Sequence, residues 1–186
     1  MPRLHIWLTS VRPGRAGLPI TSWFHGVAQA HGGFETRVVD LAEIALPMMD
    51  EPEHPRFGKY QHAHTRAWSA LCSEADAFVF VAPEYNYGFT APWKNAIDYL
   101  HREWLYKPCG FVSYGGPAGG ARMVQQAKQI VTAVKMMPMY EAVLVPLFGQ
   151  YLKDGVFAPP ELQVKSANAM LGELARWTDA MRPLRG

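Results

Sequence analysis

The sequence predicts a doubly wound α/β domain, in which a parallel sheet of five strands carries helices on both faces. Five apolar strand segments alternate with five segments of helical periodicity, which is the order expected of βαβ units with right-handed crossovers. One strand segment, residues 77–82, is an unbroken apolar run typical of a strand buried on both faces of a parallel sheet. The 186 residues, 49% of them apolar, suit one domain over residues 1–186, and no repeat or linker divides it.

The first half of the chain opens with an expected strand at residues 4–9, where bulky apolar side chains stop at a loop rich in proline and glycine. Apolar residues then recur on one helical face over residues 20–31, and Gly32 and Gly33 suit the end of this helix. A second strand is expected at residues 34–40. The long loop that follows contains three prolines and leads to a helix expected over about 58–73. Because loops of this length are often functional, we expect it near a site or an interface.

The second half begins with the central strand at residues 77–82. Pro92 suits the first turn of the next helix, where its missing amide is not needed, and apolar spacing carries this helix as far as Trp104. Apolar residues at i, i+4, i+7, i+8 and i+11 indicate a further helix from Met123 to Val134. The remaining expected elements are strands at residues 109–114 and 142–147 and a last helix at residues 167–181.

Composition excludes several classes of function. The net charge is +2 and no block of like charges occurs, which disfavours a nucleic-acid tail or a membrane-surface patch. Cys72 and Cys109 lack the spacing of a metal site or a redox motif, so a reduced, cytoplasmic protein is expected, with Cys109 as a core residue. No apolar run is long enough for a membrane span or an export signal. His62 and His64 are expected on different helix faces, which disfavours a zinc site.

The loops after the first, third and fourth strands are the candidate sites, because ligands of such sheets bind beyond the carboxyl ends of the strands. In the first loop, Ser10, Arg12 and Arg15 precede a helix N-terminus, which is suitable chemistry for a phosphate group. The alternative is a solvated basic loop. The loop matches neither the dinucleotide-binding glycine pattern nor that of nucleoside triphosphatases, so a phosphomonoester is favoured.

The other two loops could accept a planar ring. Residues 83–92 combine aromatic faces, the Asn86 amide and turn residues, which could pack on a heterocycle and bond to its polar edge. The alternative is a tyrosine-rich turn that closes the core. In residues 113–120, glycines let the backbone approach a ligand closely. Glu84 could act as an acid or base there, or hold its own turn.

Taken together, these loops resemble the NAD(P)H-dependent FMN reductase family of flavodoxin-like proteins, which includes quinone, azo-dye and chromate reductases. The resemblance rests on residues 10–15, on residues 83–88 with 94–98, and on residues 113–116, and it covers the chain to about residue 150. It implies a flavodoxin-like three-layer sandwich with a five-stranded parallel sheet, and a single FMN-binding domain.

The resemblance also assigns site residues. It implies that the FMN phosphate is held by Ser10, Arg12 and the turn at Pro19 and Ile20. The chain has Thr9 where many family members have glycine, and residues 17–19 depart from a common serine or asparagine, which leaves the contacts after Arg12 open. The isoalloxazine would be lined by Pro83, Glu84, Tyr85, Asn86 and Tyr87, and its other edge would be closed by Ser113, Tyr114, Gly115 and Gly116.

The implied activity is hydride transfer from NADPH or NADH to flavin N5, followed by electron transfer to a quinone, flavin, azo compound or metal oxyanion. A single open face predicts ping-pong kinetics, and no catalytic side chain is expected. Arg15 and Arg122 are candidates for a nicotinamide phosphate. A homodimer or dimer of dimers with flavin near the interface would suit the residues around Met48, Met49 and Trp93, and the alternative is that these are core residues. Two alternatives are a flavodoxin-like electron carrier or redox sensor without nicotinamide turnover, although the near-neutral charge disfavours it, and a scaffold without cofactor.

Overall fold

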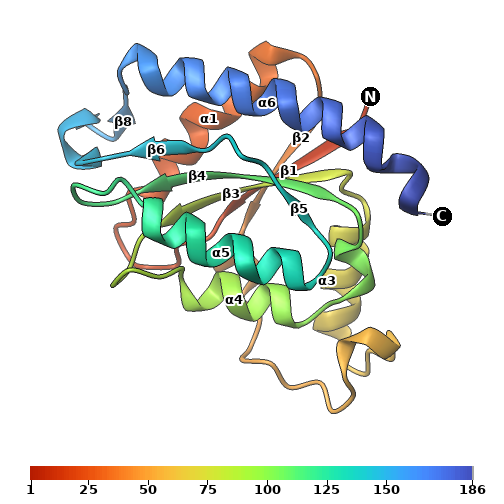
Figure 1. The fold of residues 1–186 in the computed structure, drawn as a ribbon. Coiled ribbons are helices and arrows are strands. Elements are labelled where there is room, and N and C mark those ends of the chain that lie inside the picture. The colour runs from red at the N-terminus through yellow and green to blue at the C-terminus, as the bar shows by residue number, and fades with distance from the viewer. Residues whose placement is uncertain (186) are drawn as a thin grey trace.

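The computed structural model describes residues 1–185 and shows a parallel sheet between two layers of helices (Figure 1). The strand order is β2-β1-β3-β4-β5, and a further short strand, β6, also pairs with β4. The predicted fold class, a five-stranded parallel sheet with helices on both faces, is confirmed. The strands of the main sheet are β1 (Arg3–Leu8), β2 (Glu35–Asp40), β3 (Ala77–Pro83), β4 (Pro108–Tyr114), β5 (Met137–Pro138) and β6 (Val143–Val145).

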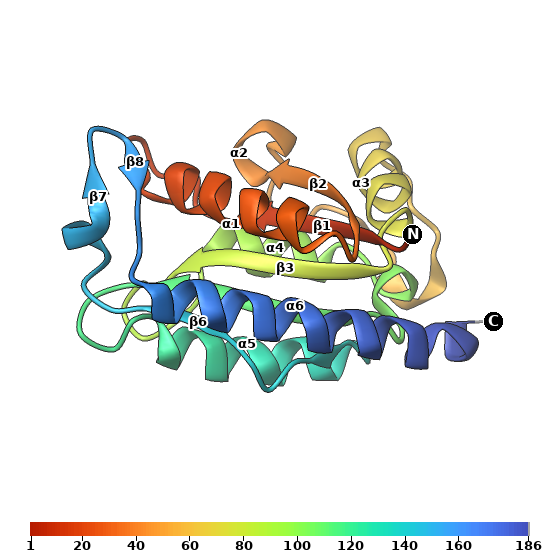
Figure 2. The same cartoon turned by 90° about the horizontal axis from the view of Figure 1, so that it is seen from above.

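Each face of the sheet has its own helical layer and its own hydrophobic core. Helices α1 (Gly17–His31) and α6 (Glu161–Met181) cover one face and run side by side in Figure 2. Helices α3 (Ala63–Ser73), α4 (Ala91–Asp98) and α5 (Ala121–Ala133) cover the other. None of the helices described has the length and apolar character needed to span a bilayer. The smaller elements are α2 (Leu41–Ile44), four 3₁₀ turns (Pro55–Phe57, Arg102–Trp104, Phe148–Tyr151, Arg182–Arg185), and the hairpin of β7 (Leu152–Lys153) and β8 (Val156–Phe157).

Aromatic side chains dominate the core beneath α3, α4 and α5. Trp7 of β1 lies at the centre of this cluster, with ring centroids 4.7 Å from Trp68 and 5.1 Å from Phe80. Alternate residues of β1, such as Ile6, point into the opposite core against α1 and α6. Every residue of β3 is buried, as its unbroken apolar sequence predicts. The central strands therefore hold both layers in place.

Several boundaries differ from the sequence-based prediction. The helix expected from residue 58 begins at Ala63, because Gly58 has a positive φ of 64° and ends a 3₁₀ turn instead. The helix expected as far as Trp104 ends at Asp98. Trp104 still enters the core, but from a separate 3₁₀ turn, where its indole N–H donates to the carbonyl oxygens of Ile97 and Leu100.

The fifth position of the sheet shows a further difference. The single strand expected at residues 142–147 is only three residues long, and Leu147 leaves extended geometry with a φ of 48°. β5 pairs with the start of β4 and β6 with its end, so two short strands share this position. The last helix begins at Glu161, six residues earlier than the expected Ala167, and the β7–β8 hairpin was not predicted.

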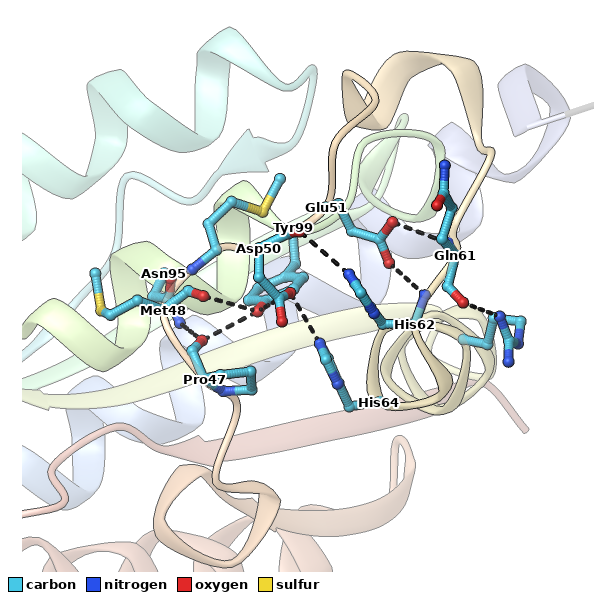
Figure 3. Close-up of polar contacts among 11 residues, drawn as sticks. Pro47, Met48, Asp50, Glu51, Gln61, His62, His64, Asn95 and Tyr99 are labelled. Carbon is cyan, nitrogen blue, oxygen red and sulfur yellow. Dashed lines mark hydrogen bonds and ion pairs between the residues drawn. The ribbon is translucent and has the colours of Figure 1, made fainter.

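The long loop before α3 is fixed by hydrogen bonds to two helices, as Figure 3 shows. On the α4 side, the Asn95 side chain donates to the Pro47 carbonyl at 2.7 Å and accepts from the Met49 amide at 2.9 Å. The Tyr99 hydroxyl donates to the Asp50 carboxylate at 2.9 Å. Burial and this bond raise the pKa of Tyr99 to about 12. The segment of residues 47–51 is therefore held against α4.

The α3 side of the same loop contains both neighbouring histidines. His62 precedes the helix and His64 lies in its first turn, so their rings stack at 5.1 Å instead of lying on different helix faces as expected. His64 contacts the Asp50 carboxylate at 3.0 Å (Figure 3). Burial favours the neutral form of Asp50, but hydrogen bonds from His64 and Tyr99 outweigh it and lower the pKa of this carboxyl group. Among residues 1–185, no group of three or more acidic, histidine or cysteine side chains is placed to hold a metal ion.

We predict that His5 of β1 makes stability depend on pH. Burial, followed by the charge of Arg37, lowers the pKa of His5 from 6.5 to about 4. Between these values the unfolded chain binds a proton that the folded protein excludes, so stability is lost as pH falls from 6.5 towards 4. Urea unfolding at pH 7 and pH 4.5 should show that wild type loses about 2 kcal/mol more than His5→Leu. An equal loss in both proteins would contradict the prediction.

Candidate functional site

The three loops predicted from sequence meet at the carboxyl edge of the sheet around a cavity of about 500 Å³. Hydrogen bonds connect their bases. The Thr9 amide donates to the Val81 carbonyl at 3.1 Å, and the Thr90 hydroxyl donates to the Thr9 carbonyl at 3.1 Å. Across the cavity, the Ser10 and Tyr85 hydroxyl oxygens lie 3.1 Å apart. The lining residues are Ser10, Arg12–Ala16, Pro83–Tyr85, Tyr114–Gly116 and Phe148.

The first loop leads into the N-terminus of α1, which has neither a side-chain cap nor an acidic residue in its first turn. The amides of this turn therefore lack helical partners and attract an anion. Gly17 brings the helix close to the sheet, because a Cβ here would lie 2.8 Å from the Tyr114 hydroxyl oxygen. The basic loop and Ala16, the residue that precedes the helix, thus line the same cavity.

The two arginines of this loop have different surroundings. Arg15 donates to the Ser10 carbonyl at 2.7 Å and forms a two-pronged ion pair with Asp40 at the end of β2. Asp40 also accepts from the Ala42 amide at 2.9 Å and so caps α2. Arg12 lines the cavity and is exposed. Arg15 therefore fixes the loop to the sheet, and Arg12 is the guanidinium available to a ligand.

The second loop forms a tight hairpin at Tyr85–Gly88. The amides and carbonyls of Tyr85 and Gly88 bond to each other at 2.9 and 3.0 Å. The two residues between them, Asn86 and Tyr87, have positive φ values of 48° and 73°, as two-residue hairpin turns of type I′ require. Left-handed geometry is strained for a bulky side chain such as that of Tyr87. The aromatic residues are thus presented by a tight, strained turn.

Glu84 joins this loop to α5. Its side chain is only 5% exposed, and its Oε1 atom accepts from the Arg122 Nε at 2.5 Å. Its other oxygen lies near the Arg122 and Met123 amides, at 3.2 and 3.4 Å. The bond from Arg122 to this carboxylate raises the pKa of the guanidinium. These contacts occupy the carboxylate, so the structure favours a structural role for Glu84 over acid or base catalysis.

The third loop presents its backbone to the cavity. The Ser113 hydroxyl is fully buried and donates to the Ala82 carbonyl at 2.9 Å, so it points into the sheet. The Tyr114 ring is also buried, and burial raises the pKa of its hydroxyl. Gly116 is exposed, with open space where a Cβ would stand. Gly120 has a φ of 88°, and a Cβ here would overlap the Ser113 Oγ.

The structure separates the residues that the resemblance assigned to the site. Ile20 is buried in the core of α1 and Ser113 in the sheet, whereas Pro19 lines a second groove of about 770 Å³ beside the first loop. Asn86 and Tyr87 stand on the hairpin beside the cavity, not among its lining residues. The assigned residues that line the cavity are Ser10, Arg12, Pro83, Glu84, Tyr85, Tyr114, Gly115 and Gly116.

Sequence reasoning missed one wall of the cavity. Phe148 comes from the 3₁₀ turn after β6, and its ring lies 5.1 Å from that of Tyr114 at a steep angle. No motif surrounds it, and it follows a short strand. The end of the strand at Pro146 and Leu147, where the backbone leaves extended geometry, was the only local signal for Phe148.

Comparison with known proteins agrees with this geometry. The profile of the NADPH-dependent FMN reductase family matches residues 2–150. The chain belongs to this family. An NAD(P)H-dependent FMN reductase of Schizosaccharomyces pombe is 38% identical over 149 residues, which cover 78% of this chain and 74% of that protein. One from a Nectria species is 33% identical over 152 residues, with 78% and 76% covered.

Like these relatives, this FMN reductase is an oxidoreductase that uses FMN and NAD(P)H. Among solved structures, the flavoenzyme NAD(P)H:(acceptor) oxidoreductase FerB of Paracoccus denitrificans superposes with a TM-score of 0.74. It shares 19% sequence identity, and the match covers 97% of this chain and 98% of FerB, which supports the flavodoxin-like fold. The β7–β8 hairpin and α6 lie beyond the matched residues 2–150.

The residues of this FMN reductase fit the cofactor. A free helix end, the Ser10 hydroxyl and the Arg12 guanidinium form a donor set for a phosphate. The cavity volume falls within the range of small-molecule sites, roughly 300–1,000 Å³. The open space at Gly116 and the Tyr85 ring suit a flat aromatic group.

We predict that two glycines of the third loop differ in their tolerance of alanine. Gly120→Ala should lower the free energy of unfolding by about 2 kcal/mol or more, because a Cβ overlaps Ser113 and the positive φ is strained. Gly116→Ala should change it by less than about 0.5 kcal/mol, since the position is open. Urea unfolding of the cofactor-free proteins provides the measurement. Equal losses in both variants would contradict the structural account of this loop.

Proposed function

We propose that residues 1–186 form one FMN-binding domain that passes electrons from NADPH or NADH to a small acceptor by a ping-pong sequence. The acceptor classes are quinones, free flavins, azo compounds and metal oxyanions. The observation that carries the proposal is one cavity that joins Ser10, Arg12 and the residue before the uncapped helix α1 to Tyr85 of the hairpin after β3. When bound, FMN supplies the redox chemistry by accepting hydride at N5 and releasing electrons to the acceptor.

The phosphate contacts follow from the first loop. Ser10 and Arg12 would donate to the phosphate together with the first amides of α1. Pro19 has no amide hydrogen, and the Ile20 amide is engaged in the first hydrogen bond of α1, so the amides of Gly17 and Leu18 remain in this turn. Ile20 would thus shape this turn without donating to the phosphate, while its side chain stays in the core. Arg12 provides the positive charge, because the charge of Arg15 is balanced by Asp40.

The chain's own residues would bind and orient the reactants. Tyr85, the backbone of residues 83–87 and the glycines at 115 and 116 would line the isoalloxazine, and Phe148 would close the cavity beside Tyr114. No proton-transferring side chain is assigned, because Arg122 and two amides occupy Glu84. Contacts to the ring edge would adjust its reduction potential.

We also infer the setting of the enzyme. Both cysteines are free and buried, which supports a reducing compartment, the cytoplasm. Met48 is 75% exposed on the segment that Asn95 and Tyr99 hold against α4. An exposed, fixed methionine supports a contact between copies, and we propose a homodimer or a dimer of dimers with FMN near this surface.

The reductive half of the proposed reaction can be observed directly. FMN-reconstituted protein, mixed anaerobically with NADPH and separately with NADH, should lose absorbance near 450 nm rapidly in a stopped-flow instrument. The faster nucleotide identifies the donor. Steady-state rates with donor and acceptor varied should give parallel reciprocal plots. Flavin that binds but does not bleach would favour an electron carrier or sensor, and intersecting plots would reject the ping-pong sequence.

The proposed assembly predicts the result of sedimentation. Wild type should sediment at two or four times the 20.8 kDa chain mass. Met48→Glu should weaken this assembly by placing a charge in the contact, whereas Leu162→Glu, at a similarly exposed position on α6, should not. A monomer at all concentrations, or equal dissociation of both variants, would argue against this surface.

A further inference from the structure

Arg122 contacts both ends of the segment that carries the aromatic hairpin. At one end it pairs with the buried Glu84 carboxylate, with its Nε atom 2.5 Å from Oε1. At the other end its guanidinium lies 3.8 Å from the centre of the Tyr87 ring. A guanidinium over an aromatic face is attracted by the negative charge of the π system. Arg122 thus fastens residues 84–87 to the start of α5.

The hairpin needs such support. Tyr87 is 61% exposed and has a φ of 73°, so the sheet core does not pack around it and its backbone is strained. A strained conformation persists only where surrounding contacts determine it. Two cross-hairpin bonds between Tyr85 and Gly88 close the turn. Within residues 1–185, the Tyr87 ring stacks with the Arg122 guanidinium and with no other aromatic or cationic group.

Tyr85 belongs both to the hairpin and to the cavity wall, so a shift of the hairpin would move part of that wall. Its hydroxyl oxygen lies 3.1 Å from the Ser10 Oγ, next to the residues proposed to hold the phosphate. Tyr85 lines the cavity, while Tyr87 and Arg122 are not among its lining residues. A change at Arg122 would therefore reach a ligand through the hairpin.

We propose that Arg122 is a positioning residue for FMN. The Arg122 guanidinium stacks on Tyr87 and pairs with Glu84, and these two contacts hold the Tyr85–Gly88 hairpin in place for the isoalloxazine. The inference rests on the proposed function, since it names how this chain orients that cofactor. It differs from a direct contact of Arg122 with a nicotinamide phosphate. Glu84 and Tyr87 already engage the guanidinium, which favours the indirect role.

A double-mutant cycle tests whether Arg122 acts through Tyr87. The dissociation constant of FMN is measured by fluorescence quenching for wild type, Arg122→Met, Tyr87→Leu and the double variant. Each single change should weaken FMN binding roughly tenfold, as the loss of a charged contact at a partly exposed site implies. The double variant should bind no more weakly than the weaker single one, because both changes remove the same contact. Tyr87→Phe retains the ring and should restore near wild-type affinity.

A spectroscopic measurement separates positioning from general stability. The visible circular dichroism of FMN, recorded at saturating cofactor, should change in Arg122→Met and Tyr87→Leu, because the ring then meets a differently placed hairpin. Arg176→Met removes an arginine–carboxylate pair, with Glu173, on the surface of α6 and should leave affinity and spectrum unchanged. If Arg122→Met fails to fold, Tyr87→Leu still tests the inference, since it leaves the Glu84–Arg122 pair in place.

Three results would overturn the inference. One is unchanged FMN affinity and spectrum in both single variants. Another is full additivity of the two changes. The third is a loss confined to kcat/KM for NADPH with NADH unaffected, which would assign Arg122 to the nicotinamide phosphate. If wild type itself binds no FMN, both the proposed function and this inference fail. If wild type binds FMN normally and the variants bind it equally well, only the role of Arg122 is rejected.

Discussion

Buried hydroxyl groups at the carboxyl ends of the central strands determine where the site can form. The Thr9 hydroxyl donates to the Val81 carbonyl, the Ser113 hydroxyl to the Ala82 carbonyl and the Thr90 hydroxyl to the Thr9 carbonyl. A buried polar group without a partner is costly, so these bonds strongly favour a single arrangement of the strand ends. The three loops therefore leave the sheet from fixed points, and the cavity between them depends on those points.

Two ion pairs hold the loops beyond this edge of the sheet in place. Arg15 joins the first loop to β2 through Asp40, and Arg122 joins the second loop to α5 through Glu84. Both carboxylates also accept backbone amides at helix starts, so each pair combines a loop anchor with a helix cap. With two guanidinium groups used in this way, Arg12 is the cavity-lining arginine whose charge remains for a ligand. The architecture thus separates residues that shape the site from one that can recognise an anion.

Local patterns were sufficient to predict the first four strands, the five main helices and the three loops, because burial on both faces and helical periodicity are visible over short windows. Contacts between distant residues were not visible. Trp104 fitted the spacing of a helix that ends at Asp98, because the spacing records burial and not backbone geometry. The partner of Arg15 is 25 residues away, and Ser113 turned inward because the Ala82 carbonyl lay on a neighbouring strand. The stacked histidines were misplaced since the helix begins one residue after His62.

The divided fifth position of the sheet has a consequence for how the protein behaves in a crowded solution. A long, flat edge strand can recruit strands of other chains and begin an aggregate. Here one edge is formed by the two- and three-residue strands β5 and β6, and the other by β2, which carries Glu35, Arg37 and Asp40. Short length on one side and charge on the other both oppose strand addition. Copies of this chain should therefore associate through helices and loops, and not by pairing the edge strands of their sheets.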